Sequence, residues 1–231
     1  MSKIRLNLHS FSSQESNPSI ELEINRLIVA GWAGRNIEAI EEHIAELEEL
    51  GVKRPTSVPC FYQLSSDLLT TSNEIQVIEP HSSGEVECVL IDSEHGLLIA
   101  IGSDHTDRKV ESYNIAISKQ VCSKPISQDA WLYTDVADHW DALVMRSYRM
   151  INGEKELYQE GQTSNLLAIP DLIKKLTQGD QFPKNHAMLC GTQAVLTQIS
   201  HGDAFYLELY DPILNRTLTH HYTVTTLDMV Q

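Results

Sequence analysis

Alternating hydrophobic and polar positions at the start of the chain predict half-buried β-strands. The alternation runs over residues 4–8 and again over 20–24, and a Ser-rich stretch separates the two segments. Successive side chains of a strand point to opposite faces, so each segment would turn its hydrophobic residues to one side of a sheet. Residues 27–30 follow as a short hydrophobic run that ends at Gly31. We therefore expect three strands, with a loop or hairpin connection between the first two.

Hydrophobic residues at helical spacing predict a helix over residues 37–50. They are Ile37, Ile40, Ile44, Leu47 and Leu50. Asn36 suits the position that caps the start of this helix, and Gly51 suits its end. A second helix is predicted at residues 170–176. Pro170 suits the first helical position, and an aspartate and two lysines follow with the signs that the helix dipole favours.

Strand-like segments and polar turns dominate from residue 55 onward. Further strands are predicted at residues 85–91, 97–101, 187–190, 205–210 and 218–225. The turn at 211–215 would join the last two of these as a hairpin. With 231 residues and no internal repeat, the chain fits one large domain of the α+β class, mostly β with a few helices.

Charge and cysteine content narrow the classes of partner and compartment. The formal net charge is −15, which argues against nucleic acid and anionic membrane as partners because both require a basic surface. A small anionic substrate remains compatible, since a cation and a few basic residues can reverse the sign inside one pocket. The four cysteines are scattered, and no hydrophobic stretch is long enough for a signal peptide or a membrane span. We expect a cytoplasmic protein with reduced thiols.

Three acidic residues on neighbouring predicted strands form a candidate metal site. Glu85 and Glu87 are two positions apart, so their side chains share one face of an otherwise hydrophobic strand. Two carboxylates there repel each other and resist burial, and a bound cation would resolve both problems. Asp104 follows the next strand, and with it the oxygen ligands would select Mg²⁺, Mn²⁺ or Ca²⁺ rather than zinc. The alternatives are a strand end that reaches solvent and an Asp-capped turn with a surface Arg–Asp pair.

A histidine and a glutamate on the first predicted helix form a candidate catalytic pair. His43 and Glu46 are three positions apart and therefore neighbours on the helix surface. A carboxylate can orient an imidazole and raise its basicity, which gives a base able to activate water. The alternative is an ordinary pair on a solvated helix face.

Short motifs follow one another along the chain in a fixed order. They are Ala-Gly-Arg-Asn at 33–36, His43-x-x-Glu46, Glu-Val-Glu at 85–87, Asp-His-Thr-Asp-Arg at 104–108, Ser-Lys-Gln at 118–120 with Pro125, Asn-Gly-Glu at 152–154, Gln-x-Gly-x-Thr-Ser at 159–164, Gly-Thr at 191–192 and Gly-Asp at 202–203. Their order and spacing resemble the catalytic domain of the fumarylacetoacetate hydrolase superfamily. Within it, the segments at 102–108 and 119–122 are similar to an uncharacterised bacterial branch, the DUF2848 group.

This resemblance implies a fold, a domain division and roles for particular residues. It implies a mixed β-sandwich roll with a few peripheral helices, with the catalytic domain at residues 26–231 and an N-terminal β extension at 1–25 packed on it. The implied metal ligands are Glu85, Glu87 and Asp104, and the implied ion is Mg²⁺, with Mn²⁺ or Ca²⁺ as alternatives. The implied catalytic residues are His43, Glu46 and Lys119, and the implied substrate-binding residues are Arg35, Arg108, Glu111, Thr163 and Thr192. Many members of the superfamily are homodimers, so a homodimer is expected.

The resemblance also implies a reaction class. A β-diketo acid or acylpyruvate-like substrate would chelate the cation, and a C–C bond would be hydrolysed through an enolate held by the metal. A decarboxylase, hydratase or tautomerase of a 2-oxo acid is the alternative within the superfamily. Outside it stand a metal-dependent phosphoesterase and a non-enzymatic binding or scaffold protein. Gln63, Glu111 and Gln193 depart from the residues common in the superfamily, which leaves the substrate open.

Overall fold

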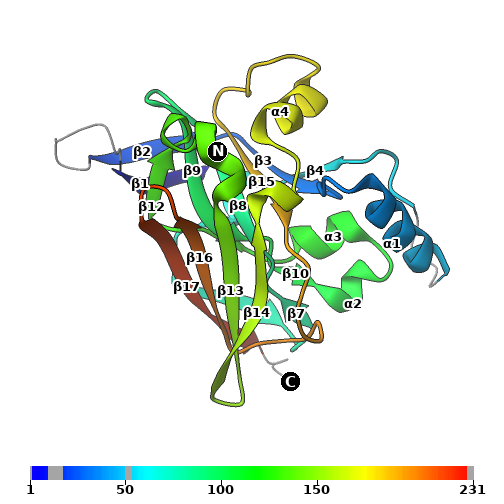
Figure 1. The fold of residues 1–231 in the computed structure, drawn as a ribbon. Coiled ribbons are helices and arrows are strands. Elements are labelled where there is room, and N and C mark those ends of the chain that lie inside the picture. Colours follow the sequence, from blue (N-terminus) through cyan, green and yellow to red (C-terminus); the bar gives the residue numbers. More distant parts are fainter. Residues whose placement is uncertain (1, 10–17, 50–53, 228–231) are drawn as a thin grey trace.

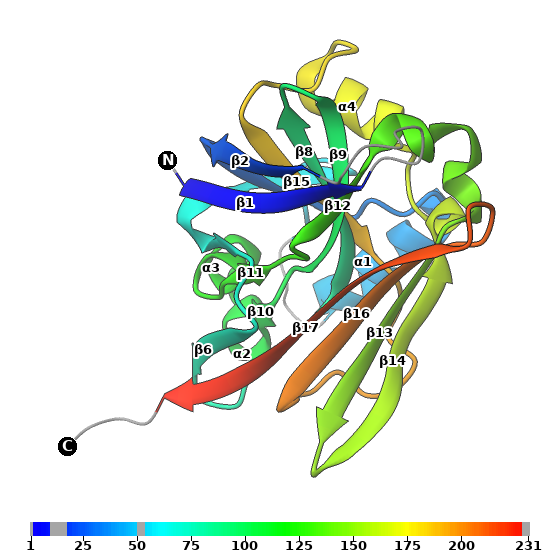
Figure 2. The same cartoon turned by 90° about the vertical axis from the view of Figure 1, so that its left-hand side faces the viewer.

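Two large curved sheets form the framework of the protein in a computed structural model that describes residues 2–9, 18–49 and 54–227 (Figures 1 and 2). The larger has eight strands over these residues, in the spatial order β2 (Ser19–Ile24), β1 (Ser2–His9), β12 (Asp129–Leu132), β9 (Gly96–Ser103), β8 (Val86–Ser93), β15 (His186–Thr192), β3 (Arg26–Gly31) and β4 (Cys60–Leu64). The smaller has five, in the order β14 (Glu154–Gln162), β13 (Val144–Ile151), β16 (Ala204–Asp211), β17 (Arg216–Leu227) and β6 (Glu74–Ile78). Two short pairs complete the strands, β10 (Thr106–Asp107) with β7 (Ser82–Ser83) and β11 (Lys124–Pro125) with β5 (Leu69–Thr70).

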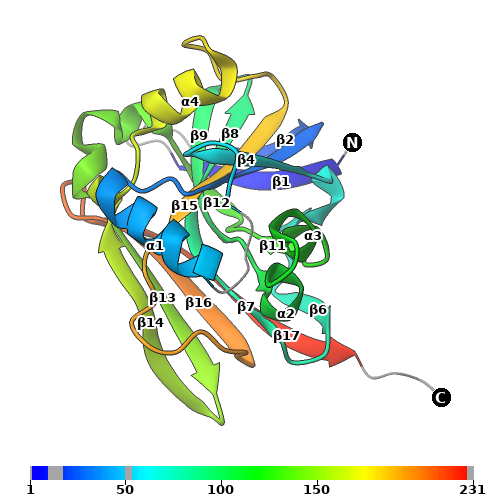
Figure 3. The same ribbon diagram turned by 90° about the vertical axis from the view of Figure 1, so that its right-hand side faces the viewer.

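The helices are short and lie outside the sheets. The α-helices are α1 (Ile37–Glu49), α2 (Arg108–Glu111), α3 (Ile115–Gln120) and α4 (Ile169–Thr177), and the 3₁₀ turns are η1 (Ser66–Leu68), η2 (Tyr133–Asp135), η3 (Ala137–Ala142) and η4 (Thr163–Asn165). Helices α1, α2 and α3 gather on one flank of the molecule, whereas α4 lies at one end (Figures 1 and 3). No helix in the described part of the chain is long and apolar enough to cross a membrane.

Strand alternation gives the protein two hydrophobic clusters, one on each face of the larger sheet. Val86 and Leu90 of β8 join the cluster that also contains Phe205 and other residues of the five-stranded sheet. Val89 and Ile91, on the opposite face of β8, belong to a second cluster drawn almost entirely from the eight-stranded sheet itself. The larger sheet therefore curls around the second cluster and packs on the smaller sheet through the first. The predicted α+β, mostly β sandwich roll is confirmed.

Both predicted helices and the N-terminal hairpin are present with nearly the predicted bounds. Strands β1 and β2 pair in antiparallel register, and β1 continues the larger sheet by parallel pairing with β12. The Asn36 side chain accepts a hydrogen bond from the N–H of Ala39, as expected of a helix cap. Helix α4 ends at Thr177, and the capping residue Gln178 adopts a left-handed φ of 58°, one position before Gly179. The predicted role of Gly51 lies outside the described residues.

The sequence-based prediction missed α2 and α3. Each helix is too short to show hydrophobic periodicity, so the pattern of residues predicts no helix at either segment. Both begin at a side-chain cap that suits their sequences. Asp107 accepts a hydrogen bond from the N–H of Val110, and Asn114 accepts one from the N–H of Ile117.

A buried carboxylate closes the hairpin between β16 and β17, far along the chain from the acidic motifs. Asp211 accepts hydrogen bonds from the N–H groups of Ile213 and Leu214, at 3.0 and 3.1 Å. His139 lies 3.1 Å from both of its oxygens, and Arg216 lies 3.3 Å from one of them. These contacts anchor the η3 segment to the hairpin and leave Asp211 fully covered.

Candidate metal centre

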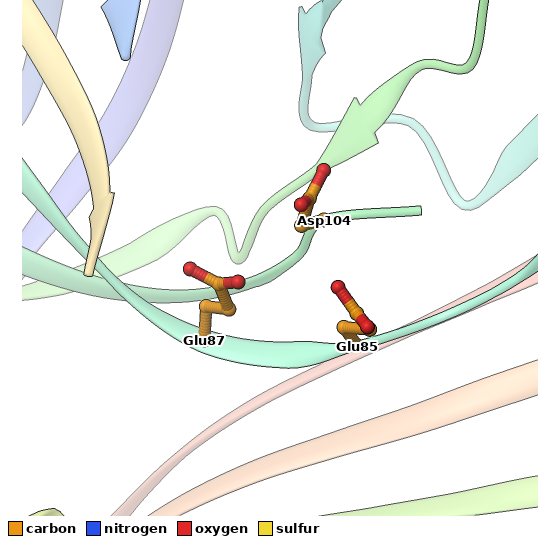
Figure 4. A group of neighbouring side chains, drawn as sticks. All are labelled: Glu85, Glu87 and Asp104. Atoms are coloured by element: carbon orange, nitrogen blue, oxygen red, sulfur yellow. The ribbon is translucent and has the colours of Figure 1, made fainter. Parts of the chain in front are cut away.

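Three carboxylates converge where β8 begins and β9 ends (Figure 4). Antiparallel pairing places Val86 opposite Ser103, so Glu85 and Glu87 at the start of β8 lie beside Asp104 after β9. One oxygen from each carboxylate lies within 4.8 Å of one from each of the others. Glu87 and Asp104 are 2% and 0% exposed, whereas the Glu85 side chain retains 16% exposure. The cluster is therefore buried on one side and reaches solvent on the side of Glu85.

The backbone around this cluster is held by hydrogen bonds from several elements. The N–H of Asp104 donates to the carbonyl of Glu85 at 3.0 Å, and the N–H of Glu85 donates to the hydroxyl of Ser103 at 3.1 Å. The N–H of Gly191 donates to Glu87 Oε2 at 2.7 Å. Gly191 has a φ of 102°, and a Cβ there would lie 2.8 Å from the Cβ of Ala33, so this donor position requires glycine.

Three basic side chains surround the carboxylates. Lys119, in the last turn of α3, donates to Asp104 Oδ2 and lies 3.8 Å from Glu85 Oε2. Lys124 Nζ lies 3.2 Å from Asp104 Oδ1. Arg108 Nη2 lies 3.0 Å from Glu85 Oε1. Glu87 makes no ion pair with any residue that the structure describes.

Burial and mutual repulsion set the protonation of the acids. Burial raises the pKa of Glu87 well above its usual value, and the negative charges of Asp104 and Glu85 raise it further. Burial acts in the same direction on Asp104, but Lys119 and Lys124 outweigh it and hold the pKa of that carboxyl at about 2. Burial lowers the pKa of the Lys119 ammonium, yet Asp104 and Glu85 more than offset this and raise it above its usual value. Glu87 thus has no ion-pair partner among the described residues, and the charge of Lys119 only partly offsets the repulsion from Asp104 and Glu85.

The residues of the cluster fit a hard divalent cation. All three candidate ligand groups offer oxygen, which Mg²⁺, Mn²⁺ and Ca²⁺ prefer. Asp104 Oδ1 is buried and lies 3.2 Å from the Lys124 ammonium, without a well-aligned hydrogen bond from the described residues. Glu87 accepts a single backbone N–H and bears the unfavourable charge. A cation at this point would satisfy both oxygens and remove the repulsion between the acids.

Three of the residues predicted to act on substrate lie at or beside the cluster. Arg108 donates to Glu111 Oε2 at 2.9 Å, so it links Glu111 to Glu85. Thr192 donates its hydroxyl proton to the carbonyl of Val86 at 2.9 Å. A cavity of about 240 Å³ opens beside Glu111, and its wall includes Cys60, Tyr62, Tyr113, Asn114 and Ile115.

The structure places two other predicted substrate-binding residues among different partners. Arg35 binds Asp141 through two hydrogen bonds of 2.8 Å. Thr163 is buried, and its hydroxyl donates to the carbonyl of Trp140. Neither has a contact with the three carboxylates among the described interactions, and a role in substrate binding stays a prediction for both.

The predicted catalytic pair cannot be placed at the level of side chains. His43 and Glu46 belong to α1, which flanks the same side of the molecule as α2 and α3 (Figure 3). Their side chains lie outside the described part of the structure. Their catalytic role therefore stays a prediction.

Two buried groups beside the cluster were not assigned a role from the sequence. Lys124 is fully buried, and its ammonium donates to the carbonyls of His105, Lys119 and Cys122 at 2.5 to 3.1 Å. His105 is also fully buried, between the hydroxyls of Tyr222 and Ser82. Burial, together with the positive charges of Lys124 and Arg108, lowers the pKa of His105 well below its usual value, so the imidazole is neutral. The sequence signal for Lys124 is a lysine directly before Pro125.

Comparison with known structures shows the fold. Ten chains of known structure match the protein. A protein described as Cg1458 matches with a TM-score of 0.65 and 14% identity, over 90% of this chain and 80% of that one. A 2-keto-3-deoxy-D-arabinonate dehydratase complexed with magnesium and 2,5-dioxopentanoate matches with a TM-score of 0.62 and 15% identity, over 94% of this chain and 79% of that one. Yeast ynq8, a fumarylacetoacetate hydrolase family protein, matches with a TM-score of 0.59 and 16% identity over 90% and 96%.

Comparison of the sequence identifies the family. No curated protein matches the chain in sequence. The family model described as "Protein of unknown function (DUF2848)" matches residues 30–222. That range contains all three carboxylates and the three basic residues around them. The chain therefore belongs to the DUF2848 family, and its fold is that of the fumarylacetoacetate hydrolase proteins.

Proposed function

We propose that this protein is an enzyme that holds one divalent cation, Mg²⁺ as the first candidate, between Glu85, Glu87 and Asp104. Its substrate would be a small anionic 2-oxo or 1,3-dicarbonyl acid. The observation that carries the proposal is the convergence of three carboxylates, two of them buried, of which Glu87 has no ion-pair partner among the described residues. A buried carboxylate without an ion-pair partner is costly to a fold, and such groups are concentrated at sites that bind ligands or catalyse reactions.

The preferred reaction is hydrolysis of a C–C bond in an acylpyruvate-like acid. The cation, when bound, would polarise a carbonyl oxygen of the acid. Water adds to the acyl carbon, and the C–C bond breaks with its electron pair going to the carbon beside the 2-oxo group. That carbon then takes a proton, so the products are a carboxylic acid and a 2-oxo acid.

The chain supplies groups for binding and for proton transfer. Lys119 lies between Asp104 and Glu85 and can donate to a substrate carboxylate or to the oxygen that gains negative charge. Arg108 holds Glu85 and Glu111 at the exposed side of the cluster, where an anionic group would enter. His43, oriented by Glu46, is our candidate for the base that accepts a proton from water. The cavity beside Glu111 would receive the part of the substrate that does not chelate.

Dehydration of a 2-oxo acid is the second candidate, because one structural neighbour is described as a keto-deoxy acid dehydratase. Decarboxylation and tautomerisation of 2-oxo acids would use the same cation and the same lysine. The products separate these reactions: hydrolysis gives two acids, decarboxylation gives carbon dioxide, and dehydration or tautomerisation leaves the carbon skeleton intact.

Activity measurements test the proposal. With Mg²⁺ present, we expect turnover of an acylpyruvate or oxaloacetate by the wild-type protein. Glu85→Ala and Glu87→Ala should each lower kcat/KM by about 10³-fold, since several kcal/mol of charge stabilisation would be lost. Glu94→Ala is the matched control, because Glu94 is exposed at the other end of the same β8–β9 hairpin.

Three results would contradict the proposal. Full activity of both variants would show that the carboxylates do not serve the reaction. Hydrolysis of a phosphate ester without turnover of oxo acids would favour a metal-dependent phosphoesterase. The absence of turnover, together with no binding of Mg²⁺ and oxalate in calorimetry, would favour a non-enzymatic binding protein.

A further inference from the structure

Side chains from two other strands bind both backbone polar groups of Val86, the residue between the two glutamates. The N–H of Val86 donates to Gln159 Oε1 at 2.9 Å. The carbonyl of Val86 accepts the hydroxyl proton of Thr192, also at 2.9 Å. The regular pairing of β8 with β15 is interrupted between Leu189 and Thr192, so side chains here supply bonds that a continuous strand would have given.

The Gln159 side chain uses its full hydrogen-bonding capacity at this point. Oε1 accepts from the N–H of Val86 and from the Ser147 hydroxyl, each at 2.9 Å. Nε2 donates to Thr192 Oγ1 at 2.9 Å and to the carbonyl of Gln193 at 2.6 Å. Gln159 is fully buried, and these four bonds fix which end of the amide is oxygen and which is nitrogen.

This amide connects the two sheets at the metal centre. Gln159 and Ser147 belong to the five-stranded sheet, whereas Val86 and Thr192 belong to the eight-stranded sheet. Thr192 both donates to Val86 and accepts from Gln159, so the three residues form a closed set of bonds. Because every member is buried or half-buried and satisfied, the set is expected to be rigid.

The orientation of the Val86 backbone decides where the two glutamates point. Residues on either side of one strand position share a face, and a rotation of the intervening backbone would turn one carboxylate away from the other. The three carboxylates repel one another, since the negative charges of Glu85 and Asp104 disfavour a negative charge on Glu87. A fixed Val86 backbone resists that repulsion before any cation is present.

We propose that Gln159 is a positioning residue of the metal centre, which, with Thr192, holds Val86 so that Glu85 and Glu87 present oxygens to one cation. This inference rests on the proposed metal site. Groups that orient metal ligands from behind commonly change affinity tenfold to a hundredfold when they are replaced. The role expected for Thr192 changes accordingly: its hydroxyl proton is committed to the backbone of Val86.

Titration of the metal-free, full-length protein with Mn²⁺ tests the inference, with free Mn²⁺ measured by electron paramagnetic resonance. Gln159→Met keeps the length of the side chain and removes all four hydrogen bonds. We expect Mn²⁺ to bind this variant tenfold to a hundredfold more weakly than the wild type. Asp211→Asn is the matched control, because Asp211 is equally buried, has four partners and lies in the β16–β17 hairpin, away from Val86 and Gln159 in the chain. It should lower the free energy of unfolding and leave Mn²⁺ affinity unchanged.

A second pair of variants keeps the test decisive if Gln159→Met does not fold. Thr192→Ser retains the hydroxyl that donates to Val86, whereas Thr192→Val removes it at nearly constant volume. We expect wild-type affinity for Mn²⁺ in the serine variant and a loss of about tenfold in the valine variant. No substrate is present, so a contact between Thr192 and substrate would not affect the result.

The outcomes separate this inference from the metal site on which it rests. Wild-type affinity in Gln159→Met, or in Thr192→Val where the first variant does not fold, would overturn the positioning role and leave the metal site standing. No Mn²⁺ binding by the wild-type protein would overturn both. If Asp211→Asn weakened Mn²⁺ binding as much as Gln159→Met, the affinity would follow overall stability. That result would also overturn the positioning role.

Discussion

Glu87→Gln should abolish divalent-cation binding and, in the same molecule, stabilise the metal-free protein. The first effect follows because an amide is a weaker ligand than a carboxylate for a hard cation and adds no charge. The second follows because Glu87 is 2% exposed, has no ion pair among the described residues and is repelled by Asp104 and Glu85. An amide keeps an oxygen for the N–H of Gly191 and gains an NH₂ group that can donate to the neighbouring carboxylates. If Glu87 had been selected for stability alone, a substitution that removes cation binding would not also stabilise the protein.

The stabilising effect should depend on pH in a defined direction. The pKa of Glu87 is raised in the folded protein, so folding is favoured while the group is protonated in both states. Wild-type stability is therefore lost as the pH rises above 4.5, the ordinary value for glutamate, and through the folded pKa. The glutamine side chain does not titrate, so the variant does not lose this stability as the pH rises. Its advantage should be small at pH 4.5 and on the order of 1–3 kcal/mol at pH 8.

Urea denaturation in the presence and absence of a chelator measures both effects. Without metal at pH 8, Glu87→Gln should unfold at a higher urea concentration than the wild type. With Mg²⁺ at a hundred times its Kd, the wild type should gain about 2.7 kcal/mol and the variant should gain nothing. Glu94→Gln, in the exposed turn of the same hairpin, should match the wild type in both conditions. A variant that still gains stability from Mg²⁺ would contradict the assignment of Glu87 as a ligand.

Lys124→Met should be the most destabilising single substitution near the metal centre. The Lys124 ammonium is fully buried and binds three backbone carbonyls and Asp104. Methionine fills the same space without donors, so three carbonyls would lose a partner and Asp104 would lose one of its two cations. Removing one partner of a buried ion pair costs about 3–5 kcal/mol. We expect the free energy of unfolding to fall by at least that amount.

The prediction for Lys124 has a sharp control. Lys124→Arg should fail to restore stability, because a guanidinium is larger and planar and cannot occupy a site built for a compact ammonium. Lys109→Met removes a surface lysine that is 68% exposed and paired with Glu79, and it should change stability by less than about 1 kcal/mol. Chemical denaturation of the three variants measures this. A loss below 1 kcal/mol for Lys124→Met would show that the buried contacts contribute little.

The two strands beside the three acids, and the acids themselves, could be predicted because their determinants are local. Alternation over residues 85–91 places Glu85 and Glu87 on one face, and the position of Asp104 after the next strand brings it beside them once the two strands pair. The resemblance to a known superfamily added the basic residues. Lys119 and Arg108 do lie against the acids.

The parts that could not be predicted depend on tertiary contacts. Lys124 binds the backbone carbonyls of three residues. Every residue has a backbone carbonyl, so the sequence does not indicate these contacts. The Gln159 amide bridges two sheets and binds backbone near a local break in the β8–β15 pairing. Sequence periodicity does not reveal such a break. Helices α2 and α3 escape prediction because four and six residues are too few for a repeating pattern.

Diffraction from crystals grown with Mn²⁺, recorded at the manganese absorption edge, tests the metal site most directly. We predict one anomalous peak between Glu85, Glu87 and Asp104, within about 2.0–2.6 Å of an oxygen from each carboxylate. A peak elsewhere, or none between these three residues in crystals that contain Mn²⁺, would contradict the assignment of this cluster as the metal centre.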